Sequence, residues 1–596
     1  MKKGQTIKNI RVTTIWFWWV GVGVAENGKK ILIKWSVLPH SIIDCVIIKA
    51  KRDHILAMPI RVVSIEDGRA DETPRCPHYS NPLVTVPDNQ VQKNGCGWCK
   101  RQLLSYSKQL ELKVHLVHDS FRSVEYIIDK VWLEAIIPSP LIYQYRNKIE
   151  FSFGKYITKA KNDKKALSLR HIEWSKAESK DPVNVNQGSQ DSGSSPEWHQ
   201  TITQEEINAI SESEFSHRFD RQLWFHKQGF YTHVVDVDQC YLISDKLHAV
   251  YHHLKLLCKA AWLPVYDSKH NEWFFRHLVL RQWVNTDQIL VNLVIATEWL
   301  DTEEKGMLWK DCKEKIVSDS FLREQCTTFI ITINNTVSDA IRRQDATTEI
   351  VRGQWYIFEE LNFRHTVQDE EINSDSSFFV EDGILKEQNK KKEKSTSNHI
   401  NNNSTTNIRF RVSPFSFFQT NTLGAQELFS KAASFIKLPH SKQTIMDLYC
   451  GAGTIGLSLL AQGIGNFVIG IEIVEDAIKD ANYNAQINKL DANSYFVAGK
   501  TEVLLRHDHN IASRLEDIGL VIVDPPREWL HKDVVDFLNN LKKQHKFQLI
   551  YISCNPVTLA RDLDLLLQAW QRDLQVLQPV DMFPHTHHVE MISVLQ

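Results

Sequence analysis

The chain lacks three features that would narrow its class at once: a strong net charge, a dense set of cysteines and a long hydrophobic run. Its 596 residues carry a formal net charge of −2, so any nucleic-acid binding must come from local basic patches. Ten cysteines in this length do not make a disulfide framework. No apolar stretch is long enough to cross a bilayer. The length leaves room for three or four domains of ~150 residues.

The N-terminus raises the question of export. Met1-Lys2-Lys3, followed by the apolar residues 15–25 with small side chains at their end, has the layout of a signal peptide. The apolar stretch is too short for a membrane span, and the rest of the chain suits a reducing compartment better. We therefore expect a cytoplasmic protein without a membrane partner, with export as the alternative.

The residue pattern divides the chain into three parts. Residues 1–68 contain short β-type runs separated by glycine, asparagine and proline, which predicts a small closed β-barrel. Residues 69–414 mix strand and helix patterns and predict an α+β domain that holds a cysteine cluster. Residues 415–596 alternate strands with helices, which predicts a doubly wound α/β domain with a mainly parallel sheet. The predicted strands are 444–448, 467–471, 520–523 and 548–553, and the predicted helices are 454–462, 475–488, 532–542 and 557–569. The expected fold class is a multidomain α/β protein.

Two polar stretches interrupt the central part. Residues 177–213 and 366–407 are rich in polar and charged side chains and cannot bury enough apolar surface to offset the entropy of ordering. We expect both to be disordered insertions. The second separates two strand-like runs, 354–361 and 408–412, so it should lie at the tip of a hairpin.

A glycine loop marks a cofactor site in the third part. Asp447-Leu-Tyr-Cys-Gly-Ala-Gly-Thr454 follows a predicted strand and precedes a helix, and Gly451 and Gly453 allow a ligand to approach the backbone. There is no third glycine at dinucleotide spacing and no Gly-Lys-Ser/Thr, so a nucleoside ligand without a pyrophosphate, such as S-adenosylmethionine, is favoured. Glu472 ends the next strand about 20 residues later, where an acid binds ribose hydroxyls. The alternative is a tight turn and a surface glutamate.

Two further strand ends carry candidate functional side chains. Asp524 follows a buried strand and is held by Pro525 and Pro526, an arrangement typical of nitrogen- or base-modifying methyltransferases. Cys554 lies between a strand and a helix, where open α/β sheets do their chemistry. A structural turn and a buried structural cysteine are the respective alternatives.

Five motifs occur along the chain in the same order as in one known protein family. They are Phe417-Phe-Gln-Thr-Asn421, Asp447-Leu-Tyr-Cys-Gly-Ala-Gly453, Asp524-Pro-Pro-Arg527, Ser553-Cys-Asn-Pro556 and His587-His-Val-Glu590, with Tyr145-Arg-Asn-Lys-Ile-Glu-Phe-Ser-Phe153 and Arg276-His-Leu-Val-Leu-Arg281 upstream. In these motifs the chain resembles the RNA (uracil-5-)-methyltransferases over nearly its whole length. The resemblance implies a Rossmann-like S-adenosylmethionine methyltransferase domain and an N-terminal TRAM-like (OB-like) RNA-binding barrel. The barrel departs from the family in having Pro39-His-Ser where Pro-Gly-Asp is frequent.

Four cysteines refine the resemblance. Cys76, Cys96, Cys99 and Cys240 match the branch that methylates large-subunit (23S) ribosomal RNA and carries a [4Fe–4S] cluster. Two departures are a longer gap between the first two cysteines and Trp98 in place of a glycine. Spacing alone does not separate iron–sulfur from zinc, and free cysteines are a third possibility.

The resemblance also implies a mechanism. Cys554 attacks carbon 6 of uracil as a thiolate, carbon 5 takes the methyl group, and Glu590 removes the carbon-5 proton. We expect the N-terminus of the following helix to lower the pKa of Cys554. The positions that match family cofactor contacts are Gln419, Tyr449, Gly451, Gly453, Thr454, Glu472 and Asp524, although Thr454 stands where many members have asparagine.

Two other functions stay open. One is the same reaction on transfer RNA, and the other is an RNA-binding or assembly factor with an idle catalytic domain. His585, His587 and His588 are not expected to bind zinc, because the motif explains them without a metal. We expect a monomer that binds RNA.

Overall fold

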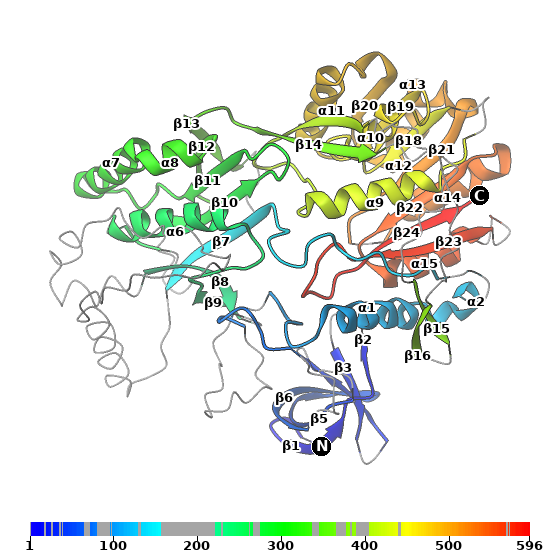
Figure 1. The fold of residues 1–596 in the computed structure, drawn as a ribbon, viewed down its shortest axis with the longest axis horizontal. Coiled ribbons are helices and arrows are strands. Elements are labelled where there is room, and N and C mark those ends of the chain that lie inside the picture. Colours follow the sequence, from blue (N-terminus) through cyan, green and yellow to red (C-terminus); the bar gives the residue numbers. More distant parts are fainter. Residues whose placement is uncertain are drawn as a thin grey trace, which may run out of the picture.

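The computed structural model describes most of the chain (Figure 1). The described residues are 2–16, 20–25, 28–34, 37, 40–64, 72–79, 96, 98–128, 131, 133–155, 221–227, 230–261, 263–265, 274–336, 345–364, 377–381, 384–388, 405–438, 443–527, 529–567, 570 and 573–596. In these ranges no helix combines the length and the apolar character that spanning a membrane requires.

The N-terminal strands form one sheet that closes on itself. Its order is β1-β5-β6-β4-β3-β2. The two outer strands, β1 and β2, follow each other in the chain and are connected by Val12 and Thr13. The Val12 N–H donates to the Ser41 carbonyl (2.8 Å), next to β5, and the Thr13 N–H donates to the Val22 carbonyl (2.7 Å) of β3, so the chain continues from one edge of the sheet to the other. This pairing is that of a small closed β-barrel, and its identity as a TRAM-like module stays a prediction. The strands are β1 (Thr6–Arg11), β2 (Thr14–Trp16), β3 (Val20–Val24), β4 (Lys30–Ile33), β5 (Ile42–Ala50) and β6 (His54–Ser64).

The central part is built on a seven-stranded sheet with the order β13-β12-β11-β10-β7-β8-β9. Three helices contribute apolar side chains to the core that covers it. The strands are β7 (Lys148–Lys155), β8 (Arg221–Lys227), β9 (Phe230–Asp236), β10 (Phe275–Gln282), β11 (Ile289–Ile295), β12 (Thr328–Ile333) and β13 (Thr347–Arg352), and the helices are α6 (Asp245–Ala260), α7 (Glu303–Ser318) and α8 (Ser320–Gln325).

The C-terminal part is a second seven-stranded sheet with the order β20-β19-β18-β21-β22-β24-β23. The first five strands are parallel, and β24 runs antiparallel to β22. The strands are β18 (Thr444–Leu448), β19 (Phe467–Glu472), β20 (Ser494–Ala498), β21 (Ile518–Val523), β22 (Gln548–Ser553), β23 (Leu574–Val580) and β24 (Glu590–Leu595), and the helices are α9 (Thr422–Ser434), α10 (Thr454–Ala461), α11 (Glu475–Ile487), α12 (Thr501–His507), α13 (His509–Ala512), α14 (Lys532–Gln544) and α15 (Pro556–Leu567).

Both faces of this sheet are buried, as the doubly wound prediction requires. Successive residues of a strand point to opposite faces, so Leu520 and Ile522 pack with α9, α10 and α11, whereas Val521 and Val523 pack with α14 and α15. Four of the predicted strands and the helices between them lie within a few residues of their predicted positions. The sequence analysis missed β20, β23 and β24.

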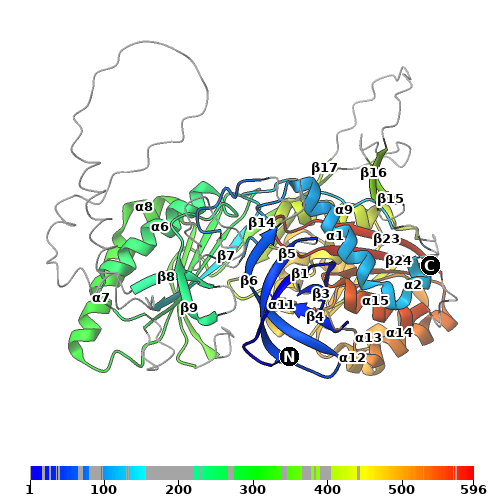
Figure 2. The same ribbon diagram turned by 90° about the horizontal axis from the view of Figure 1, so that it is seen from below.

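The structure divides the chain differently from the predicted boundary at residue 414. Helix α1 (Tyr106–Ser120), followed by α2 (Glu125–Ile128), packs against α15 and shares the C-terminal core (Figure 2). Ile137 lies in register with Val580 of β23. The hairpin of β14 (Ile357–Arg364) and β17 (Thr405–Val412) joins the core on the opposite face of the same sheet. Sequence periodicity shows that such a segment has an apolar face but not which sheet the face covers.

The second insertion lies at the tip of this hairpin, as expected. It is not structureless, because β15 (Ser377–Glu381) pairs with β16 (Ile384–Gln388) within it. The sequence analysis overlooked apolar residues on both sides of Asp382-Gly383, a favoured hairpin turn. The first insertion, 177–213, lies outside the described residues.

Candidate active site

The glycine loop after β18 has the backbone of a ligand-binding turn. Tyr449, Gly451 and Gly453 all have positive φ (64°, 55° and 76°), which is strained for the tyrosine. A Cβ atom on Gly451 would meet nothing within 4 Å, whereas one on Gly453 would lie 3.0 Å from Phe496. Gly451 therefore borders open space, and Gly453 is needed for packing. Thr454 starts α10 directly behind the loop.

Three carboxylates lie at the carboxyl ends of neighbouring strands around this loop. Glu472 accepts hydrogen bonds from the N–H groups of Gly451 (3.2 Å) and Val474 (3.0 Å). Asp447 accepts one from the Gly456 N–H (2.9 Å), while its Oδ1 atom is buried without a partner among the described residues. Burial raises the pKa of both Asp447 and Asp524 to about 7. A cluster of three carboxyl groups of this kind suits a ligand with positive charge. Asp447 was not singled out from the sequence, although it ends a strand within the glycine motif.

Cys554 and Glu590 are brought together by an antiparallel strand pair. Ser553, the last residue of β22, is in register with Met591 of β24. Cys554 and Glu590 come directly beyond this last pair, and the Glu590 carboxylate is close enough to raise the pKa of the Cys554 thiol. Burial, reinforced by Asp524, raises the pKa of Glu590 to about 8. The sequence marked both residues but could not place them side by side.

The expected low pKa of Cys554 is wrong. Burial, Glu590 and Asp524 together raise the pKa of this thiol to about 12, and the Arg527 guanidinium is the charged group that lowers it. The helix N-terminus does not outweigh two nearby carboxylates in a dehydrated site.

Asn555 ties two catalytic loops together. Its Oδ1 atom accepts the N–H of Val557 (3.1 Å) and so caps α15, while its Nδ2 atom donates to the Arg527 carbonyl (3.1 Å). The turn that carries Cys554 is thereby fixed to the loop that carries Arg527. Gln419, the remaining predicted cofactor residue, is half-buried before α9, and its carbonyl accepts from Asn147 Nδ2 (2.9 Å).

A buried ion pair anchors the segment that leads to Glu590. Lys113 of α1 donates to Asp581 Oδ1 (2.6 Å) and to the Phe583 carbonyl (3.0 Å), and the two charged side chains are 1% and 0% exposed. Gln109, one helical turn away, accepts the N–H of His585 (2.8 Å) through Oε1. Burial lowers the pKa values of His585, His587 and His588 to about 4, 2 and 3, so these imidazoles are neutral.

We expect Lys113→Met to destabilise the protein by about 3–5 kcal/mol, because it leaves the Asp581 carboxylate buried and unpaired. The matched control is Lys479→Met, which removes a surface pair with Asp476 (64% and 27% exposed) and should cost about 1 kcal/mol or less. Thermal and urea unfolding measure both. Equal losses in the two variants would contradict the role of the buried pair.

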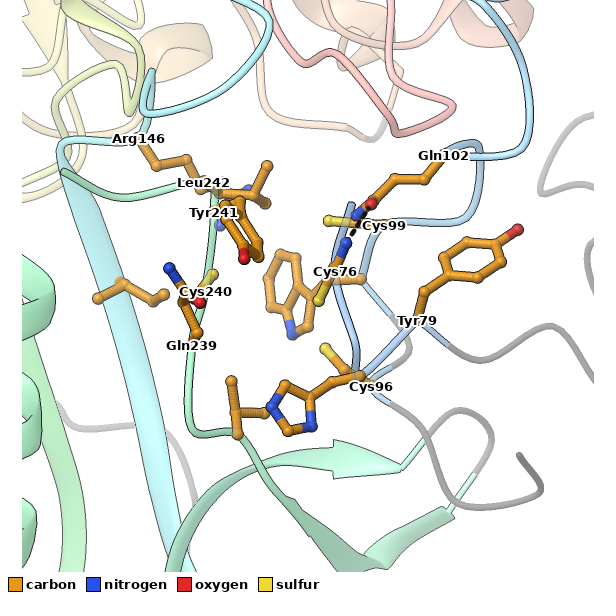
Figure 3. A pocket seen from close by; sticks show the side chains of 14 residues that line it. Cys76, Tyr79, Cys96, Cys99, Gln102, Arg146, Gln239, Cys240, Tyr241 and Leu242 are labelled. Carbon is orange, nitrogen blue, oxygen red and sulfur yellow. Dashed lines mark hydrogen bonds between the residues drawn. The ribbon is translucent and has the colours of Figure 1, made fainter. Parts of the chain in front are cut away.

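Cys76, Cys96, Cys99 and Cys240 line one small cavity (Figure 3). The Tyr79 N–H donates to the Cys76 carbonyl (3.0 Å) and the Cys96 N–H donates to the His78 carbonyl (2.8 Å). The longer gap in the sequence therefore does not separate the first two cysteines, and residues 80–95 between them lie outside the described ranges.

These thiols do not yet form a closed metal site. In the described part of the chain, no three His, Cys, Asp or Glu side chains are grouped as the ligands of a metal ion. Burial raises the pKa of all four thiols, to about 11 for Cys240, and neighbouring cysteines raise it further for Cys96, Cys99 and Cys240. Joint deprotonation therefore requires a compensating cation.

Comparisons with known proteins agree with the motifs. Residues 385–596 match the model of the tRNA (Uracil-5-)-methyltransferase family. Uncharacterized RNA methyltransferases of Bacteroides thetaiotaomicron and Caldanaerobacter subterraneus subsp. tengcongensis are 28% and 27% identical, covering 97% and 100% of this chain and 99% and 100% of their own.

A solved structure shares the fold. It is the Pyrococcus abyssi tRNA (uracil-54, C5)-methyltransferase in complex with S-adenosyl-L-homocysteine, with a TM-score of 0.56 and 20% identity over 98% of this chain and 100% of that one. The resemblance seen in the motifs is confirmed over residues 385–596, which match the uracil-5-methyltransferase family, and nearly the whole chain is similar to RNA methyltransferases.

Proposed function

We propose that the protein methylates carbon 5 of a specific uridine in RNA through a covalent bond between Cys554 and carbon 6 of the base. The neighbouring positions of Cys554 and Glu590, just beyond the last paired residues of β22 and β24, carry this proposal. A thiol beside a carboxylate, with Asp524 close to both, supports a nucleophile and a base that act on one substrate.

Each side chain then has a separate task. The Cys554 thiol loses its proton to solvent, assisted by the Arg527 guanidinium, and its sulfur bonds to carbon 6 while the electron pair moves toward carbon 5. When bound, S-adenosylmethionine would supply the methyl group to carbon 5 and leave as S-adenosylhomocysteine. The Glu590 carboxylate removes the carbon-5 proton, and the bond between sulfur and carbon 6 breaks.

The cofactor contacts follow from the loop geometry. Gly451 leaves room for the ligand, Gly453 and Thr454 shape the turn, and Glu472 lies where ribose hydroxyls would bind. The carboxyl groups of Asp447, Glu472 and Asp524 complement the positive charge of S-adenosylmethionine. Tyr449, Asp524 and Gln419 complete the proposed cofactor contacts.

We further propose that the four cysteines hold a [4Fe–4S] cluster and that the substrate is large-subunit ribosomal RNA. A single zinc ion needs four sulfurs about 2.3 Å from one point, whereas a cluster spreads its ligands over several iron atoms around a larger volume. Four thiols around one cavity could serve either group, and the resemblance of these cysteines to the iron–sulfur branch supports the cluster. The cluster would organise the segment from Cys96 to α1, because methyl transfer needs no electron from it.

We expect the purified protein to be brown, with a broad iron–sulfur absorbance that Cys96→Ser removes. Cys258→Ser is the matched control, because Cys258 is buried in α6 and does not line the cavity. Iron, sulfide and zinc analysis of both variants measures the content. Colourless protein with one bound zinc would refute the cluster.

The substrate is tested by incubating the protein with labelled S-adenosylmethionine and either 23S ribosomal RNA or transfer RNA lacking the modification. We expect 5-methyluridine in digests of the ribosomal RNA. The same nucleoside in transfer RNA alone would favour the transfer RNA alternative, and binding to RNA without any methylation would favour an idle assembly factor. We propose that the N-terminal barrel is an RNA-binding module and that the protein acts in the cytosol. We also propose a monomer, since one chain supplies every residue named above.

A further inference from the structure

One exposed aromatic side chain beside the active site has no part in the mechanism. Among the described residues, three Trp or Phe side chains are more than two-fifths exposed, namely Trp98, Phe417 and Trp529. Trp98 lines the cysteine cavity, and Phe417 belongs to a family motif. Trp529 is 60% exposed and lies two residues after Arg527.

The chain is held directly after Trp529, although the Trp529 ring is exposed. The next residue, Leu530, is 1% exposed, and its N–H donates to Asp562 Oδ2 (2.9 Å) of α15. The same oxygen accepts the hydroxyl of Tyr551 on β22 (2.8 Å). A large apolar ring that is exposed next to an anchored residue is typical of a binding surface.

A cation lies against the ring. The Arg561 guanidinium carbon is 4.7 Å from the centre of the Trp529 ring, and its side chain is 48% exposed. Val557, also exposed, precedes Arg561 by one turn of α15, so both lie on the same face of the helix. An exposed strip therefore runs from the turn of Cys554 along α15 to Trp529.

The geometry points to Trp529 as a stacking platform for an unpaired base of the RNA strand that flanks the target uridine. Arg561 lies seven residues beyond Cys554, or about 10 Å along the helix axis, so the platform is within reach of a neighbouring nucleotide when the target base enters the site. Single-stranded RNA binds to aromatic faces beside cationic side chains, and every base has a face that can stack. This inference rests on the proposed function for the identity of the strand, and it adds a residue that grips the RNA without taking part in methyl transfer.

The test measures binding of a fluorescent, short oligouridylate by anisotropy, without S-adenosylmethionine. We expect Trp529→Ala to weaken binding about 5- to 150-fold and Trp529→Phe to stay within about threefold of wild type. The slope of affinity against salt should not change, because no charge is removed. Trp299→Ala is the matched control, since Trp299 is also stacked by a cation (Lys305, 4.1 Å) but lies in the central part; it should bind like wild type.

An abasic scan makes the test specific. Removing the base that stacks should weaken wild-type binding about as much as Trp529→Ala does, and the two changes together should cost no more than either alone. Wild-type affinity in Trp529→Ala, a changed salt slope, additive losses, or an equal loss in Trp299→Ala would each overturn the inference. Binding is measured without methyl transfer, so an inactive Cys554 would defeat the proposed function and leave this result intact. The unfolding temperatures of the variants show whether a loss of binding is due to misfolding. If Trp529→Ala is misfolded, the binding of Trp529→Phe tests the inference: affinity within about threefold of wild type supports it, and a larger loss overturns it.

Discussion

Cys554→Ala is expected to abolish methylation, by at least about 10⁴-fold, and to prevent any covalent complex with RNA. The reaction needs a nucleophile to make carbon 5 reactive, and no neighbouring side chain replaces a thiolate on carbon 6. Labelled methyl transfer to RNA measures the first effect, and a gel shift under denaturing conditions measures the second.

Cys450→Ala is the control for this experiment. Cys450 lies in the glycine loop, is buried, and its Sγ atom is 3.8 Å from the Gly451 carbonyl. Burial raises the pKa of both thiols, so their positions distinguish them: Cys450 is buried inside the glycine loop, whereas Cys554 is partly exposed. If Cys450→Ala lost the covalent complex while Cys554→Ala kept it, Cys450 and not Cys554 would be the nucleophile.

Glu590→Gln is expected to slow turnover by about 10²- to 10⁴-fold and to let the covalent complex accumulate on ordinary RNA. The glutamine cannot remove the carbon-5 proton, while attack by Cys554 still proceeds. In the wild-type protein, the rate at which methylated RNA is released from Cys554 should rise as the pH increases through about 8. The raised pKa of Glu590 leaves its carboxyl group protonated below that pH and ionised above it. The variant should lose this part of the pH profile.

Glu475→Gln provides the comparison, because Glu475 is an exposed acid at the start of α11. It should keep both the rate and the pH profile of wild type. A Glu590→Gln variant that turns over normally, or that forms no complex at all, would remove Glu590 from the role of the base.

The parallel core of the catalytic domain could be predicted because its signals are local. β18 and β22 are short apolar runs bounded by turn residues, and their predicted limits are the observed ones. β23 and β24 were missed, although they place Glu590 beside Cys554. Their pairing joins residues from distant parts of the chain, and no short-range pattern reports it.

Two errors have the same physical origin. Helix α1 was assigned to the central part, yet its Lys113 forms the buried pair with Asp581 of the catalytic domain. The pKa of Cys554 was expected to fall because a helix follows it, yet burial and two carboxylates raise it. Both outcomes depend on groups brought together by tertiary packing, which the local sequence does not contain.

The central claim is tested most directly by the mass of the complex formed with S-adenosylmethionine and RNA that carries 5-fluorouridine at the target. Fluorine blocks removal of a proton from carbon 5, so the intermediate is trapped. We predict one product with the mass of protein, RNA and one methyl group, whose peptide map places the RNA on Cys554. No complex, a complex without the methyl group, or RNA attached to another residue would contradict the proposed mechanism.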